Sequence, residues 1–110
     1  MEQELIELCH IYSLDEGDTK EFSLCGDYRI FVVKKHGQVY GYHNRCPHAG
    51  WPLNLNPDKF LDVDKAFIQC ANHMATFDIT SGICVAGPCI GAGLTKAVLK
   101  IADNKIWFRT

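Results

Sequence analysis

Apolar residues crowd several short stretches of the chain, separated by glycines, prolines and polar residues. The clearest stretch is YRIFVVK (28–34), where both sets of alternating positions are largely apolar. A strand shows this pattern when it is buried on both faces. QVYGYH (38–43) follows at once, and Gly37 between the two predicts a hairpin turn.

Further stretches extend the β pattern. They are ELIELCHIY (4–12), EFSL (21–24), KAFIQC (65–70), ATFDI (75–79) and KAVLKIADNKIWFRT (96–110), the last predicted as two strands joined at Asp103-Asn104. SLDEGDTKEF (13–22) is the one helix candidate, with Ser13 as its cap, although Gly17 argues against a long helix. Residues 44–59 and VAGPCIGAG (85–93) have the composition of loops, and TSG (80–82) that of a turn. The pattern predicts an all-β, mostly antiparallel protein.

Composition narrows the possible functions. The chain has 110 residues, which predicts a single domain over 1–110. Its net charge of −2 provides no basic surface for nucleic acid or an anionic membrane. The opening MEQELIELCH lacks the basic flank and apolar run of a signal peptide. We therefore expect a soluble, cytoplasmic protein.

Four of the potential metal ligands form two short pairs. RCPHAG (45–50) contains Cys46 and His48, and QCANHM (69–74) contains Cys70 and His73. A tetrahedral zinc ion accepts two Cys and two His ligands. Pro47, however, stiffens the single-residue gap of the first pair and makes chelation of one ion awkward. Two iron atoms bridged by sulfide remove this difficulty, because each pair can then contact both metals.

The two motifs C-P-H (46–48) and C-A-N-H (70–73) resemble those of the Rieske family, as do TFDITSG (76–82) and CVAGP (84–88) after them. The resemblance implies a small antiparallel Rieske fold, in which a cluster-binding subdomain of two loops, approximately residues 44–90, is inserted in a β-sandwich or barrel base. It implies one [2Fe–2S] cluster per chain.

The resemblance also assigns the ligands. Cys46 and Cys70 would bind the buried iron, and His48 and His73 the outer iron through Nδ1. A loop containing a proline covers the cluster in this family, and Gly87-Pro88 falls at that place. The chain departs from the family at Ala71 and Met74, where proline and glycine are usual, and its spacing between the two motifs is longer.

The resemblance also bears on the reduction potential. High-potential Rieske proteins carry a disulfide between their loops and hydroxyl groups that donate hydrogen bonds to sulfur. The corresponding residues here are Trp51 and Asn72 for the disulfide, and Ala75 and Phe77 for the hydroxyls. None of the four has the required chemistry. We therefore expect a potential on the order of −150 mV, at the low end of the Rieske range.

The implied function is one-electron transfer without catalysis, so no catalytic residue is predicted. A reductase would supply the electron and a terminal oxygenase would accept it, both docking near His48 and His73. One alternative is a small Rieske subunit of a larger oxidoreductase such as assimilatory nitrite reductase. Another is a structural zinc domain that acts as a binding module.

Other candidate residues have competing interpretations. Cys84 and Cys89 either form a redox-active disulfide or are two small buried thiols. His43 is an alternative ligand to His48. Cys9 and Cys25 are expected to be structural. The last candidates are Asp58, Asp62 and Asp64, which form either an acidic docking patch or a solvated loop.

Overall fold

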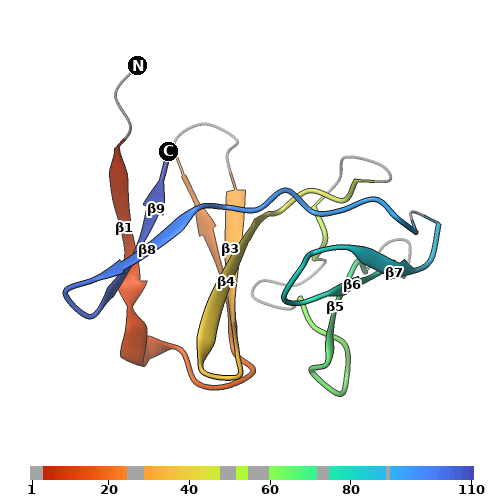
Figure 1. The fold of residues 1–110 in the computed structure, drawn as a ribbon, viewed down its shortest axis with the longest axis horizontal. Helices are drawn as coiled ribbons and strands as arrows, with labels where there is room; N and C mark the ends of the chain where they lie inside the picture. The colour runs from red at the N-terminus through yellow and green to blue at the C-terminus, as the bar shows by residue number, and fades with distance from the viewer. Residues whose placement is uncertain (1–3, 25–28, 48–51, 55–59, 72–74, 89) are drawn as a thin grey trace.

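The computed structural model describes residues 4–24, 29–47, 52–54, 60–71, 75–88 and 90–110. In these ranges the chain forms three antiparallel sheets of three strands each, in the orders β1-β9-β8, β2-β3-β4 and β5-β6-β7 (Figure 1). The strands are β1 (Leu5–His10), β2 (Thr19–Ser23), β3 (Arg29–Lys35), β4 (Gln38–His43), β5 (Phe67–Gln69), β6 (Thr76–Asp78), β7 (Cys84–Ala86), β8 (Leu99–Ala102) and β9 (Lys105–Arg109). The predicted all-β fold is confirmed.

The first two sheets form what we call the base. Their hairpins turn where the sequence predicted. His36 and Gly37 both have positive φ, 53° and 75°, between β3 and β4. Asp103 and Asn104 do the same between β8 and β9, at 55° and 60°. Two consecutive left-handed residues match the twist of the strands that they join, which favours these tight hairpins.

The predicted helix over residues 13–22 is wrong. The described chain has only one turn of 3-10 helix nearby, η1 (Ile11–Ser13), and residues 19–23 form β2. Gly17, with φ of +84°, sits in a turn in which the side chain of Asp18 accepts a hydrogen bond from the Asp15 amide. No helix among the described residues is long and apolar enough to cross a bilayer.

Strand β3 contributes to all three buried cores. Its residues Ile30, Phe31, Val32 and Val33 are all fully buried, as the sequence predicted for a strand covered on both faces. Ile30 and Val32 pack into the base. Phe31 and Val33 belong to a larger core that includes side chains of the third sheet. The base and the third sheet therefore share one central strand.

The third sheet, which we call the site sheet, is built from short strands and tight turns. The Asp78 carboxylate accepts hydrogen bonds from the Ser81 amide and hydroxyl, at 2.9 and 2.7 Å, which shapes the predicted turn at 80–82. The predicted loop over 85–93 is wrong at its beginning, because β7 extends to Ala86. Cys84 pairs with Phe77 of β6, and this pairing makes the segment a strand.

The chain enters and leaves the site sheet through two segments that lie side by side. The His43 amide donates to the Thr95 carbonyl at 2.8 Å, and the Ala97 amide donates to the Gly41 carbonyl at 2.9 Å. In Figure 1 the long segment before β8 runs alongside the end of β4 on its way back to the base. These bonds connect the site sheet to the base at both crossings.

Candidate metal centre

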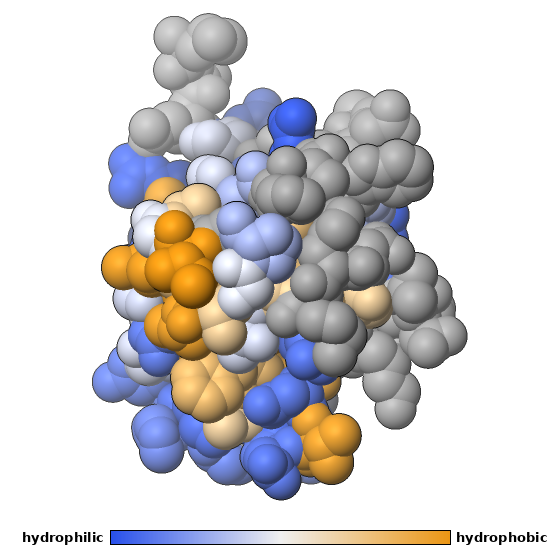
Figure 2. Space-filling view, turned by 90° about the vertical axis from the view of Figure 1, so that its right-hand side faces the viewer, coloured by the Kyte–Doolittle hydropathy of each residue, from blue (hydrophilic) through white to orange (hydrophobic). Residues whose placement is uncertain are grey.

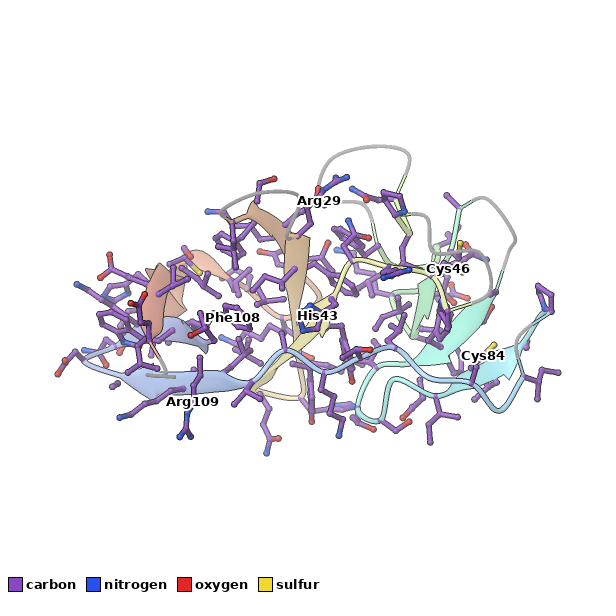
Figure 3. All side chains as sticks on the ribbon, turned by 90° about the horizontal axis from the view of Figure 1, so that it is seen from above. Arg29, His43, Cys46, Cys84, Phe108 and Arg109 are labelled. Carbon is purple, nitrogen blue, oxygen red and sulfur yellow. The ribbon has the colours of Figure 1, made fainter. Side chains whose placement is uncertain are left out.

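The two predicted cysteine ligands lie in one buried core. Cys46 follows β4 and Cys70 follows β5, and neither side chain is exposed to solvent. Both belong to the same core as Leu53, Ala75 and Phe77. Figure 3 places Cys46 at the end of the molecule that carries the site sheet, remote from Phe108 in the base. Folding thus brings the thiols of two distant motifs into one apolar environment.

Backbone hydrogen bonds connect the two motifs. We call residues 44–54 the first ligand loop and residues 70–75 the second ligand loop. The Ala71 amide donates to the Leu53 carbonyl at 2.8 Å, which joins one loop to the other. The Cys70 amide donates to the Ala75 carbonyl at 2.8 Å, which closes the second loop on itself. These bonds hold Ala71 next to Leu53 and Cys70 next to Ala75.

The predicted cover loop approaches the second ligand loop closely. A Cβ atom added to Gly87 would lie 2.8 Å from the Cα of Ala75, and Gly87 has a φ of +102°. Only glycine accepts this combination of left-handed backbone and close approach without strain. Cys84, buried nearby, donates its thiol hydrogen to the Ala86 carbonyl at 3.2 Å. The structure therefore requires glycine at position 87, which the sequence motif alone did not establish.

The two predicted histidine ligands, His48 and His73, lie outside the described residues, as do Trp51 and Asn72. Among the described residues, no three or more His, Cys, Asp or Glu side chains are grouped to hold a metal ion. The buried pair Cys46 and Cys70 fits the cysteine half of a [2Fe–2S] centre, since buried thiolates are the usual ligands of such clusters. The complete ligand set stays a prediction.

Comparison with known proteins decides the family. The model of the Rieske [2Fe-2S] domain matches residues 4–102. The chain belongs to the Rieske [2Fe-2S] domain family. The predicted cofactor, a Rieske-type [2Fe–2S] cluster, follows from this membership.

Two curated relatives of this Rieske domain differ in length. Apoptosis-inducing factor 3 of Homo sapiens is 28% identical over 102 residues, which are 93% of this chain and 16% of that protein. Sulredoxin of Sulfurisphaera tokodaii is 29% identical over 83 residues, which are 71% of this chain and 72% of that protein. The chain thus spans about a sixth of the first relative, and most of the second.

Solved structures share the fold. The ferredoxin of carbazole 1,9a-dioxygenase from Nocardioides aromaticivorans IC177 has a TM-score of 0.74 and 22% identity, covering 94% of this chain and 95% of its own. A chain in the complex of reduced oxygenase and oxidized ferredoxin in carbazole 1,9a-dioxygenase has a TM-score of 0.76 and 16% identity, covering 94% and 91%. At these identities the likeness establishes the Rieske fold of the chain.

His43 has a structural environment of its own in the base. Its ring meets Phe108 of β9 edge-on, with 6.2 Å between the ring centroids, and burial lowers the pKa of its imidazole. Figure 3 shows His43 between Phe108 and Cys46. Packing against β9 explains this histidine without metal binding, which favours His48 as the ligand of the first loop.

The structure describes only some of the other cysteine and aspartate residues singled out in the sequence. Cys9 packs against the base core, as expected for a structural cysteine. Asp62 accepts hydrogen bonds from the amides of Ala66 and Phe67, so its carboxylate shapes the turn before β5. Cys25, Asp58 and Cys89 lie outside the described residues, and the pairing of Cys84 with Cys89 stays untested.

Sequence reasoning missed a polar network beneath the first ligand loop. It consists of Glu21 on β2, Arg29 on β3, and the amide side chains of Asn44 and Asn54 at the two ends of the loop. The only signal in the sequence was an asparagine on each side of the first motif. The contribution of Glu21, which is remote along the chain, is visible only in the folded protein.

Proposed function

We propose that this Rieske domain is a one-electron carrier that receives electrons from a reductase and delivers them to a terminal oxygenase. The burial of Cys46 and Cys70 on two connected loops is the observation that carries the proposal. The structural likeness to a ferredoxin of carbazole 1,9a-dioxygenase supports the oxygenase as acceptor. In this proposal no residue of the chain is catalytic.

In the proposed site Cys46 and Cys70 hold one iron, and His48 and His73 hold the other. A bound Rieske cluster supplies a reversible one-electron step. The protein keeps water away from the two cysteines, since both are fully buried among apolar side chains. The bond from Ala71 to Leu53 joins the loop of Cys46 to the loop of Cys70, which helps to preorganise the two cysteines.

The surroundings of the cysteines support a low reduction potential. Ala75 and Phe77 are fully buried in the same core as the two thiols, and neither side chain has a hydroxyl. The hydroxyl of Tyr42, in that core as well, donates to the Ile79 carbonyl. With no hydroxyl donor at these two positions, the reduced cluster should be less stabilised, so voltammetry should give a potential on the order of −150 mV. A value of about +200 mV would contradict this.

An apolar surface supports partner docking at the same end of the molecule. Ile83, Val85 and Ile90 are 50%, 49% and 71% exposed on and beside β7. Figure 2 shows apolar side chains gathered on one side of this end of the protein. Exposed aliphatic side chains of this kind mark interaction surfaces. We propose that partners dock near His48 and His73, and that this apolar surface contributes to the contact.

Iron analysis and EPR test the cluster. The purified protein should contain about two iron atoms per chain and, when reduced, give the EPR spectrum of a mixed Cys and His cluster. Replacing His73 with Ala should abolish that spectrum, as should Cys46→Ser. The matched control is His36→Asn, which changes a histidine in the base hairpin to a residue that tolerates its φ of 53°. A normal spectrum for His73→Ala, or a protein that binds zinc only, would overturn the ligand assignment.

The second candidate is a Rieske subunit or domain of a larger oxidoreductase, such as assimilatory nitrite reductase. One observation favours it, since the chain aligns with 16% of a much longer relative. Reconstituted electron transfer separates the two candidates. The carrier should reduce a terminal oxygenase with multiple turnovers as a free protein. Stable co-purification with one large oxidoreductase, without turnover in trans, would support the subunit instead.

A further inference from the structure

One buried side chain, that of Asn44, joins the two ends of the first ligand loop. Asn44, 6% exposed, accepts a hydrogen bond from the Leu53 amide through Oδ1 at 2.8 Å. Its Nδ2 donates to Asn54 Oδ1 at 2.9 Å. One side chain thus holds both ends of the loop that contains Cys46. Since only Arg45 separates Asn44 from Cys46, their Cα atoms are at most about 7 Å apart.

Glu21 fixes this side chain to the base. Its carboxylate accepts hydrogen bonds from Nδ2 of Asn44 and, at 3.3 Å, from Nδ2 of Asn54. It also forms an ion pair with Arg29, whose Nη2 lies 2.6 Å from Glu21 Oε2. The Arg29 carbonyl accepts a further bond from the Asn44 amide at 2.9 Å. Strands β2 and β3 therefore anchor the loop through two side chains and one backbone bond.

The charge of Glu21 persists at neutral pH. Burial by itself would raise the pKa of its carboxyl, but hydrogen bonds from Arg29, Asn44 and Asn54 outweigh burial and hold the pKa below its ordinary value. The Glu21 side chain is 12% exposed, whereas that of Arg29 is 38% exposed. Solvent therefore screens the cation more than the anion.

We propose that Asn44 and Glu21 are positioning residues for the first ligand loop, and that the Glu21–Arg29 ion pair adjusts the reduction potential of the cluster. This inference rests on the proposed function, because it requires a cluster bound at Cys46. The reduced cluster carries one more negative charge than the oxidised one. A carboxylate beneath the loop disfavours reduction, and a guanidinium favours it.

Two single variants test the electrostatic part. Glu21→Gln removes the anion and should raise the midpoint potential. Arg29→Gln removes the cation and should lower it. The matched controls are Glu7→Gln and Lys105→Gln, which remove the partners of an ion pair of 2.7 Å on the other sheet of the base. These controls should leave the potential unchanged. Equal shifts in test and control variants, or shifts of the same sign for Glu21 and Arg29, would overturn the proposal.

A charge exchange tests the positioning part. Asn44→Asp places a second carboxylate against Glu21, so this variant should lose most of its iron. The double variant Asn44→Asp/Glu21→Gln restores one carboxylate and one amide with the original total charge, and it should recover iron content and the EPR spectrum. Loss without recovery would show that the two side chains do not act as a pair.

The EPR spectrum of the wild-type protein separates a failure of the proposed function from a failure of the proposed roles of Glu21, Arg29 and Asn44. If the reduced wild-type protein has no Rieske EPR spectrum, the proposed function fails. If that spectrum is present and the variants behave as their controls do, only the role of Glu21, Arg29 and Asn44 fails. Circular dichroism of each variant without iron shows whether the base remains folded, so a general loss of structure is distinguished from a loosened loop.

Discussion

Strands β3 and β4 pair along six positions, whereas each strand of the site sheet has only three residues. The base therefore gains its order from long ladders and from hairpins with matched turns. The site sheet has few paired positions between its strands, yet its side chains contribute to the largest of the three buried cores. Individual contacts must therefore stabilise the site sheet, since its strands are too short to do so by pairing alone.

Those contacts are close approaches and single hydrogen bonds. Gly87 lies against Ala75, and a Cβ on Gly82 would lie 2.6 Å from the ring of Tyr42. The Tyr42 hydroxyl in turn donates to Ile79, which links β4 of the base to the turn after β6. The comparison teaches that the metal-binding part of this fold depends on specific residues, while the base depends on strand pairing. Three predictions test that difference.

Removing the cluster should produce the largest effect. Under the proposed ligand assignment, removal of the cluster breaks the link between the first and second ligand loops, and the amides of Cys70 and Ala71 should exchange with solvent at least about tenfold faster. Amides in the ladder between β3 and β4 should keep their protection. Hydrogen exchange of the loaded and chelator-treated protein, read by mass spectrometry, measures both regions at once. Equal acceleration everywhere would show that base and site sheet unfold together.

Gly87→Ala should have the next largest effect. The added methyl group meets the backbone of Ala75, and φ of +102° is strained for alanine, so the free energy of unfolding should fall by about 3 kcal/mol. Gly91→Ala is the matched control. Its φ is +91°, but nothing lies within 4 Å of the added Cβ, so about 1 kcal/mol of backbone strain is expected. Denaturant unfolding measures both, and equal losses would refute the close approach.

Tyr42→Phe should have the smallest effect. It leaves the Ile79 carbonyl without the hydroxyl that it accepts from, which should cost about 1–2 kcal/mol. Tyr40→Phe is the control, since the Tyr40 hydroxyl bonds to Gln38 at an exposed position, and its loss should be close to zero. Thermal unfolding of the two variants compares a link between base and site sheet with a bond within one strand.

The same tyrosine predicts a dependence on pH. Burial, with smaller contributions from Asp78 and Tyr40, raises the pKa of Tyr42 from 10.0 to about 12. The folded protein therefore holds this proton more tightly than the unfolded chain. The resulting stabilisation is fully present below about pH 10 and is lost as the pH rises towards 12. Tyr42→Phe should lack this part of the alkaline decline, as urea midpoints between these pH values would show.

Local chemistry explains why much of the fold and the family was predictable. Strand patterns such as IFVVK depend on which residues are apolar, and the turns at His36-Gly37 and Asp103-Asn104 depend on residues that accept positive φ. The two Cys and His pairs are defined by residue type and spacing, so the Rieske resemblance needed no coordinates. Each of these features acts over a few neighbouring residues.

Tertiary contacts decided the rest. Strand β7 exists because Cys84 pairs with Phe77, and residues 19–23 are a strand because they pair with β3. Glu21 reaches Asn44 across 23 positions of the chain, and Gly87 meets Ala75 from a separate loop. Such contacts depend on how distant segments are brought together, and no local pattern records them. The sequence alone determined most of the strands, the hairpin turns and the candidate ligands, while folding decided strands β2 and β7 and the contacts around the ligand loops.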